Sequence, residues 1–383
     1  MTGFPRGRTA IAGAATFGIG EAPGHSSMDI AVNASIKALR QANLTPGDVD
    51  ALFICLPGDF ISGLSFAEYL GIRPKITENN RTGGSAFLTH IAWAALALDA
   101  GLCDTALIAY GSNQRTAAGR LVSAASPDPW EGPYKPRLPV SAYALAAARH
   151  MHDYGTTPEQ LAEVAISARQ WANLNPDAFM QGDLSVDDVL SARRVSTPLG
   201  VRDCCLVTDG GAAIVMTRAD RAKDLTATPV HVLGAAAATC HMNISMMPEL
   251  TVTAAAESGP RAMAQAGVTV ADIDVVELYD AFTINSILFM EDLGFCPKGE
   301  GGRFFEDGRT APGGEIPVNT NGGGLSCVHP GMYGLFTVVE AAEQIAGTAG
   351  ARQVEGVDVA LAHGNGGFLS SQVTAILGSP ATV

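Results

Sequence analysis

The most restrictive feature of this 383-residue sequence is an internal repeat. Residues 38–50 read ALRQANLTPGDVD and residues 262–274 read AMAQAGVTVADID, so one pattern returns in constant register. In each copy an alanine-rich helical pattern ends at a residue suited to a helix C-cap, Asn43 or Gly267. An Asp-x-Asp turn then leads into an apolar strand. The repeat predicts a chain built from two related halves.

Strands and glycine-rich turns surround both copies of the repeat. Residues 79–84 form a turn that leads into a helix at 85–100, and residues 319–324 form a turn before the helical stretch that follows His329. The predicted strands are residues 9–15, 51–56, 105–110, 230–236, 275–278 and 357–363. Strands that alternate with helices predict mostly parallel sheets covered by helices on both faces. We therefore expect an α/β fold of duplicated βαβαββ-type halves in α/β/α/β/α layers.

The repeat also predicts where the chain divides. We expect a first half at residues 1–225 and a second half at residues 226–383, two units of ordinary domain size. Residues from about 115 to 200 have no counterpart of similar length in the second half, and this stretch is rich in proline between Pro127 and Pro139. We interpret it as an inserted cap over the functional site.

Composition and charge exclude several kinds of partner. A formal net charge of −14 disfavours nucleic acid and anionic membranes. The longest apolar candidate for a membrane span, residues 91–110, is interrupted by Asp99 and Asp104. Seven cysteines without a Cys-x-x-Cys pair argue against a disulfide framework and a zinc site. We expect a cytoplasmic protein without a metal, whose partner is a small molecule or another protein.

Six short motifs follow one another in a distinctive order. They are YGTTPEQLA at 154–162, DGGAA at 209–213, YDAF at 279–282, NxxGG at 319–323, HPG at 329–331 and GNGG at 364–367. With the duplication, they resemble the thiolase superfamily over nearly the whole chain, particularly the branch around the thiolase domain of sterol carrier protein X. The resemblance implies the thiolase fold, a coenzyme A thioester as substrate, no permanently bound cofactor, and a homodimer that pairs through the first-half sheets.

The thiolase nucleophile is missing from its expected place. Thiolases carry a cysteine at the start of the helix after the first glycine-rich turn, where main-chain N–H groups and the helix dipole favour a thiolate. This chain has Asn80 there, and a carboxamide is no nucleophile. We interpret Cys204, Cys205 and Cys327 as packing residues. The expected reaction therefore proceeds without an acyl-enzyme.

Further departures point to a particular group of relatives. Tyr279 begins the motif that starts with Asn or His in thiolases, and His363 stands in place of their C-terminal cysteine. Together with the HPGMYG stretch at 329–334, these residues resemble the thiolase-like aldolases of bacterial steroid side-chain degradation. The resemblance implies retro-aldol cleavage of a β-hydroxyacyl-CoA to a ketone and a shorter acyl-CoA. It also implies a small protein partner with an OB-fold and a zinc ribbon.

A retro-aldol reaction needs an acid and a base, and donors for the thioester oxygen. The resemblance makes Tyr279 the acid/base candidate and His329 the oxygen donor, while Tyr333 pairs with Tyr279 and His363 is a further catalytic candidate. Packing aromatics and a satisfied core histidine are the structural alternatives for these residues. The candidates for substrate binding are Asn80, Asp280, Gly322, Gly323, Gly324, Asn365 and Gly366, of which Asp280 is interpreted as a turn or supporting residue.

Two alternatives stay open at this stage. The chain is an acetyl-CoA acyltransferase or a condensing enzyme like a β-ketothiolase if another cysteine or a partner supplies the acyl group. It is a non-catalytic subunit that binds acyl-CoA or lipid in a thiolase-like complex if the loss of the cysteine reflects a loss of catalysis.

Overall fold

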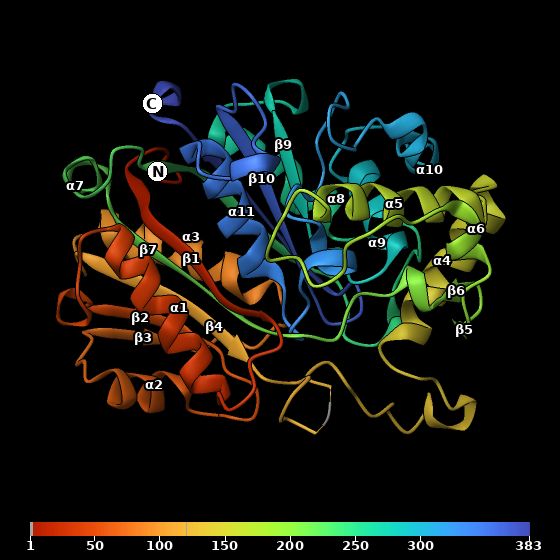
Figure 1. Ribbon diagram of the computed structural model, residues 1–383, viewed down its shortest axis with the longest axis horizontal. Helices are drawn as coiled ribbons and strands as arrows, with labels where there is room; N and C mark the ends of the chain where they lie inside the picture. Colours follow the sequence, from red (N-terminus) through yellow and green to blue (C-terminus); the bar gives the residue numbers. More distant parts are fainter. Residues whose placement is uncertain (1–2, 120) are drawn as a thin grey trace.

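Helices and strands alternate along the chain in the computed structural model, which describes residues 3–119 and 121–383 (Figure 1). The strands are β1 (Thr9–Gly20), β2 (Ala51–Ile54), β3 (Ile76–Glu78), β4 (Thr105–Ser112), β5 (Arg194–Ser196), β6 (Leu199–Gly200), β7 (Asp209–Arg218), β8 (Val230–Thr239), β9 (Val275–Leu278), β10 (Val359–Gly366) and β11 (Ser371–Gly378). The helices are α1 (Ser27–Gln41), α2 (Ser62–Leu70), α3 (Ala86–Asp99), α4 (Val140–Tyr154), α5 (Pro158–Ala172), α6 (Val186–Leu190), α7 (Ala219–Leu225), α8 (Ala255–Ala266), α9 (Thr283–Asp292), α10 (Gly301–Phe304) and α11 (Gly334–Ala346).

The strand order shows the duplication. The main sheet runs β3-β2-β4-β7-β1-β8-β11-β10-β9, and the second half repeats the order of the first in reverse. Strands joined through helices pair in parallel, as in β2 with β4 and β9 with β10. The sheet is mixed, because β7 and β11 pair antiparallel with both of their neighbours. These two strands were absent from the sequence prediction.

Two central helices separate the halves into layers. β1 and β8 are paired only through Ala10 with His231 and Ile11 with Val230. Elsewhere α3 and α11 lie between the half-sheets, since each contacts strands of both halves and the two helices contact each other. α1 packs on the outer face of the first half-sheet, and α8 packs on that of the second. The expected α/β/α/β/α arrangement of the thiolase fold is confirmed.

A glutamine in each copy of the repeated sequence makes the same hydrogen bond to the first strand of its half. The side-chain oxygen of Gln41 accepts a hydrogen bond from the main-chain nitrogen of Ala14 at 2.9 Å, and Gln265 accepts one from Ala235 at 2.9 Å. Each glutamine therefore ties its helix to the first strand of its own half. The helices then end as predicted, with Gly267 at φ +69°.

The aspartates that follow the repeated helices hold the next strand. Asp50 accepts a hydrogen bond from the main-chain nitrogen of Thr105, which begins β4, at 2.9 Å. Asp274 does the same for Val359, which begins β10, at 2.9 Å. A buried main-chain N–H needs such a partner, so the two aspartates are explained by the fold rather than by chemistry.

The inserted segment covers one end of the second half. Between β4 and β7 the chain forms α4, α5 and α6 and the small β5-β6 sheet, drawn in yellow and green in Figure 1. α4 and α5 pack against α9, and α5 also packs against the turn Gly323–Cys327. No helix in residues 3–119 or 121–383 has the length and apolar character of a membrane span. The division of the chain at residue 225 stays a prediction.

Candidate functional site

Three aromatic rings meet where the second half faces the first. Tyr279 directly follows β9, while His329 and Tyr333 lie in the loop before α11. The ring centroid of Tyr279 lies 5.4 Å from that of His329 and 5.7 Å from that of Tyr333, both edge to face. The rings of His329 and Tyr333 are stacked at 6.1 Å. The structure thus brings together three of the four predicted catalytic residues.

A glycine of the first half lets this cluster form. A Cβ atom placed on Gly84 would lie 1.9 Å from Cε2 of Tyr279, so no larger residue fits there without moving the ring. Gly84 belongs to the turn that begins with Asn79 and leads into α3. The site is therefore assembled from both halves, with the Tyr279 ring resting on the turn that holds the thiolase nucleophile position.

The two tyrosines are neutral proton donors. Burial raises the pKa of both phenols well above 10. The hydroxyl of Tyr333 donates to Oδ1 of Asn321 at 3.0 Å. The hydroxyl of Tyr279 makes only a long contact, 3.4 Å, to the carbonyl oxygen of Gly331. The Tyr279 hydroxyl is therefore the freer of the two to bind a substrate.

His329 is held by its main chain and carries a free ring nitrogen. Its main-chain nitrogen donates to Oγ1 of Thr208 at 3.0 Å, and its carbonyl oxygen accepts from Nε2 of Gln114 at 2.8 Å. Its own Nε2 is buried and has no partner among the described residues. Burial lowers the pKa of His329 to about 4, so the ring is a neutral imidazole at pH 7. An orphaned buried polar atom costs about 1–3 kcal/mol, which favours a ligand oxygen at this position.

Asp280 shapes the glycine-rich turn through both of its carboxylate oxygens. Its carboxylate accepts from the main-chain nitrogens of Gly324 at 2.6 Å and Leu325 at 3.3 Å. Burial raises its pKa to about 7. Gly322 and Gly323 have φ of +101° and +64°, and a Cβ on Gly323 would lie 2.1 Å from Asp280. The Asp280 carboxylate thus holds the turn through its main-chain nitrogens, and the turn needs glycine at position 323 to leave room for this carboxylate.

The main chain and the side-chain oxygen of Asn80 are held within the first half. Its main-chain nitrogen donates to Nε2 of His90 at 3.2 Å, and its Oδ1 accepts from the main-chain nitrogen of Thr82 at 3.0 Å. All cysteines are free. Burial raises the pKa of the Cys204 thiol to about 12 and also raises those of Cys205 and Cys327, so none of the three is a thiolate at neutral pH.

His363 lies apart from the three rings. Its Nδ1 bonds with Oγ1 of Thr374 at 2.9 Å and its Nε2 with Oε1 of Gln372 at 2.9 Å, while its ring packs edge to face on Phe289. Burial lowers its pKa to about 4. Both ring nitrogens are occupied, in contrast with His329. The structure does not bring the His363 ring together with the other catalytic candidates.

Asn365 and Gly366 press the last glycine-rich turn against the first. The carbonyl oxygen of Asn365 accepts from the main-chain nitrogen of Ser85 at 3.1 Å. A Cβ on Gly366 would lie 1.8 Å from the carbonyl oxygen of Thr82. Asn365 and Gly366 therefore fix how closely the turn at 364–367 approaches the turn at 79–84, on which the Tyr279 ring rests.

Sequence reasoning missed Tyr143, which α4 of the inserted segment brings to this place. Its ring stacks on Phe282 at 4.3 Å, and its hydroxyl donates to the carbonyl oxygen of Gly367 at 3.1 Å. Burial raises its pKa to about 12. Tyr143 lies within an alanine-rich helical pattern, and no motif there signals a site. Sequence reasoning also missed Gln114 and Thr208, which hold the main chain of His329, and Asn321, which accepts from the Tyr333 hydroxyl although it lies within the NxxGG motif.

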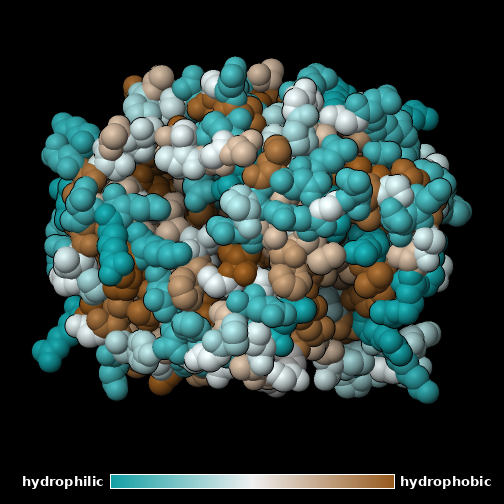
Figure 2. All heavy atoms as spheres, in the orientation of Figure 1, coloured by the Kyte–Doolittle hydropathy of each residue, from teal (hydrophilic) through white to brown (hydrophobic). Residues whose placement is uncertain are grey.

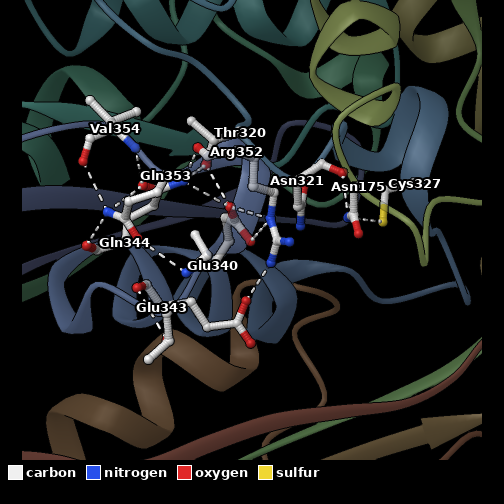
Figure 3. A network of polar contacts seen from close by, with 12 residues as sticks. Asn175, Thr320, Asn321, Cys327, Glu340, Glu343, Gln344, Arg352, Gln353 and Val354 are labelled. Atoms are coloured by element: carbon white, nitrogen blue, oxygen red, sulfur yellow. Dashed lines mark hydrogen bonds and ion pairs between the residues drawn. The ribbon is translucent and has the colours of Figure 1, made fainter.

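A polar network supports Asn321 from behind (Figure 3). Nδ2 of Asn175 donates to the carbonyl oxygen of Asn321 at 2.9 Å. In the figure Arg352 lies between Asn321 and Glu340, and its Nε donates to the Glu340 carboxylate at 2.9 Å. A cavity of about 50 Å³ adjoins these groups, which is room for about one water molecule. Asn321, which accepts the hydrogen bond of the Tyr333 hydroxyl, is thus itself held in place.

A surface hollow lies away from this cluster, and the metal-binding side chains of the described residues form no ion site. Within residues 3–119 and 121–383, no group of three or more metal-binding side chains is suited to an ion. The surface hollow of about 840 Å³ is lined by Gln170 and residues between Arg303 and Glu315, and none of the site residues borders it.

Acid is expected to destabilise the fold between pH 6.5 and about 4. The pKa values of His329 and His363 are near 4 and that of His90 is near 3, below the ordinary 6.5. In this window the unfolded chain binds more protons, so the free energy of unfolding falls as the pH decreases. At roughly 1.4 kcal/mol per pKa unit, the shifts of His329 and His363 are each worth about 3 kcal/mol and that of His90 about 5 kcal/mol.

Urea unfolding at pH 7, 5.5 and 4.5 measures this slope. His90→Gln is the matched variant, because it removes one titrating ring and retains an acceptor for the main-chain nitrogen of Asn80. We expect a flatter pH dependence in the variant. An identical slope in both proteins would contradict the assignment of a buried neutral His90.

Comparisons with known proteins agree with this geometry. The family described as "Thiolase C-terminal domain-like" matches residues 236–379. The chain is 35% identical to an acetyl-CoA acetyltransferase of Methanothermobacter thermautotrophicus, over 94% of this chain and 96% of the relative. It is 32% identical to a steroid side-chain-cleaving aldolase of Thermomonospora curvata, over 90% of this chain and 91% of the relative.

Solved structures give the same result. The structure titled "Ltp2-ChsH2(DUF35) aldolase" superposes with a TM-score of 0.89 at 30% sequence identity, and the match covers 98% of both chains. The chain therefore belongs to the thiolase superfamily, in the branch of the sterol carrier protein 2 thiolases and the thiolase-like aldolases.

Proposed function

We propose that the chain cleaves a β-hydroxyacyl-CoA of the steroid side-chain type by a retro-aldol reaction, yielding a ketone and a shorter acyl-CoA. The observation that carries this proposal is the meeting of two phenol rings and an imidazole ring beside a turn that has no thiol. The names of the related aldolases point to the same class of reaction. Thioester and C–C bond chemistry at such a site needs donors and proton transfer, and no covalent intermediate.

The proposed proton transfers balance within one turnover. Tyr279 accepts the proton of the β-hydroxyl group while it passes its own proton to Tyr333, and Tyr333 gives its proton to the α-carbon as the bond between the α- and β-carbons breaks. Each phenol ends with one proton, so the resting state is restored in the same step. Because burial keeps both phenols neutral, we expect these transfers to be concerted, so that no free phenolate accumulates.

His329 is assigned to the thioester oxygen. This oxygen becomes an enolate oxygen when the C–C bond breaks, and a preorganised N–H donor stabilises the developing charge. The unpartnered Nε2 of His329 supports this role, as does its main chain, which Thr208 and Gln114 hold. Gly322, Gly323 and Gly324 are proposed to admit the thioester, with Asn80, Asn365 and Gly366 on the facing turns and Asp280 as their support.

One experiment tests both the reaction and its main competitor. The full chain is incubated in a single turnover with a β-hydroxyacyl-CoA that bears a tertiary alcohol and a radioactive shorter acyl portion. We expect ketone and shorter acyl-CoA in equal amounts and no label on the protein. Label retained on the chain, and released by free CoA, would instead support an acyltransferase.

The acyltransferase is the second candidate because a relative of 35% identity is an acetyl-CoA acetyltransferase. Against it stand the raised thiol pKa values and the asparagine at the nucleophile position. Absence of both products and label would leave the non-catalytic acyl-CoA-binding subunit as the remaining candidate.

We propose a homodimer that pairs through the first half-sheet. β3 lies at the edge of this sheet, and a sheet edge offers unpaired main-chain groups to a second copy. Nearby Phe60 is 83% exposed and Leu64 is 62% exposed. Figure 2 shows hydrophobic spheres at the lower left, in the region of β3 and α2. A small OB-fold and zinc-ribbon partner is proposed from the likeness to the Ltp2-ChsH2(DUF35) aldolase.

A further inference from the structure

A chain of buried hydrogen bonds runs from His363 to the inserted segment. Nε2 of His363 bonds with Oε1 of Gln372 at 2.9 Å, and Nε2 of Gln372 donates to Oδ1 of Asn365 at 2.8 Å. Nδ2 of Asn365 then donates to the hydroxyl oxygen of Tyr143 at 2.9 Å. Behind His363, Nδ1 bonds with Oγ1 of Thr374 at 2.9 Å. All five residues are buried.

The donors and acceptors of this chain define one direction. An amide oxygen only accepts, so the Gln372 oxygen requires the hydrogen of His363 on Nε2. A neutral ring then leaves Nδ1 as an acceptor for the hydroxyl of Thr374. The Tyr143 hydroxyl, which accepts from Asn365, is left to donate to the carbonyl oxygen of Gly367. Each member thus sets the orientation of the next.

Asn365 connects this series of hydrogen bonds to the turn that supports Tyr279. Its side chain holds Tyr143, and its carbonyl oxygen holds the main-chain nitrogen of Ser85 at 3.1 Å. Ser85 follows Gly84, on which the ring of Tyr279 rests. A displacement of Asn365 would therefore move both Tyr143 and the support of Tyr279.

We propose that His363, Gln372 and Asn365 form a positioning chain that holds Tyr143 and the Gly84 turn against Tyr279, so that His363 acts by donating a hydrogen bond and not by exchanging a proton with the substrate. The inference rests on the proposed retro-aldol function for its effect on rate. Through Tyr143, helix α4 of the inserted segment joins this hydrogen-bonded chain.

His363→Gln separates positioning from acid/base catalysis. The Nε2 of a glutamine reaches about the place of the histidine Nε2 and still donates to Gln372, but it has no proton to exchange. We expect kcat of this variant within about threefold of wild type. His363→Leu and Gln372→Leu break the chain, and kcat is expected to fall about tenfold, the rate equivalent of roughly one displaced hydrogen bond.

The double variant and the pH profile complete the test. If the residues act as one chain, His363→Leu combined with Gln372→Leu is no slower than either single variant. The pH profile of kcat is expected to be the same for His363→Gln and wild type between pH 5.5 and 8. A His363→Gln enzyme as slow as His363→Leu would overturn the proposal and return His363 to an acid/base role.

An NMR measurement that does not depend on activity tests the positioning chain separately from the proposed retro-aldol function. In protein with ¹⁵N-labelled histidine, the His363 resonance is identified by its loss in His363→Gln. We expect a neutral ring with its hydrogen on Nε2 that does not titrate between pH 5.5 and 8. A wild-type protein that shows this ring but cleaves no β-hydroxyacyl-CoA would refute the proposed function alone, whereas a hydrogen on Nδ1 would refute the chain.

Discussion

Replacing Tyr279 or Tyr333 by phenylalanine is expected to lower kcat by about 10²- to 10⁴-fold, the usual worth of a positioned acid or base. Each change removes one hydroxyl and leaves the ring, so the edge-to-face contact of the two rings at 5.7 Å is retained. The affinity for acyl-CoA is expected to change little, because the lost interaction is made in the transition state.

The structure predicts that the two variants differ in stability. The Tyr279 hydroxyl makes only its 3.4 Å contact, so Tyr279→Phe is expected to leave the free energy of unfolding almost unchanged. Tyr333→Phe loses a hydrogen bond to Asn321, whose Oδ1 retains the main-chain nitrogen of Gly323 at 2.7 Å. We expect a cost of about 1 kcal/mol for this variant.

Kinetics of β-hydroxyacyl-CoA cleavage and urea unfolding measure both effects. Tyr154→Phe serves as the matched control, since Tyr154 is 41% exposed and lies outside the ring cluster. Wild-type rates in both cluster variants would refute the tyrosine mechanism. Proton transfer would then pass to His329.

Loss of the His329 ring nitrogen is expected to lower kcat/KM by about 10²- to 10³-fold without destabilising the fold. A preorganised donor to a developing oxyanion has an effect of this size. His329→Phe keeps a ring that stacks on Tyr333 and removes the buried Nε2 that lacks a partner. Removing an unsatisfied polar atom is expected to leave the free energy of unfolding equal or slightly higher.

His329→Gln is the rescue variant for this prediction. Its side-chain amide restores an N–H donor near the position of the histidine Nε2, so part of the lost rate is expected to return. The comparison is made at pH 7, where the wild-type ring is neutral. Equal rates in the Phe variant and wild type would mean that the thioester oxygen is held by another group.

The periodic features of this chain were predictable because they follow local rules. Gln41 and Gln265 recur since each helix needs the same tie to its first strand, and Asp50 and Asp274 recur since each following strand begins with main-chain N–H groups that need an acceptor. Strands β7 and β11 were not predicted from the sequence. Each pairs antiparallel between two other strands of its half-sheet, and that position depends on neighbours far away in sequence.

The amino-acid sequence alone determined the two-half α/β fold and the absence of a cysteine at the nucleophile position, because both are properties of residue identity and spacing. Only the tertiary structure decided which side-chain atoms are free to react. His329 and His363 are the same residue type beside similar glycine-rich turns, yet one has an unpartnered Nε2 and the other has both nitrogens bonded.

The physical reason is that hydrogen-bond partners come from distant segments. Asn365 holds Tyr143 across 222 positions of sequence, and His329 is held by Gln114 across 215. Local patterns carry no information about such pairs, since they exist only after the inserted segment has packed against the second half. The sequence thus determined which residues were candidates, and packing decided which of them have a polar atom without a partner.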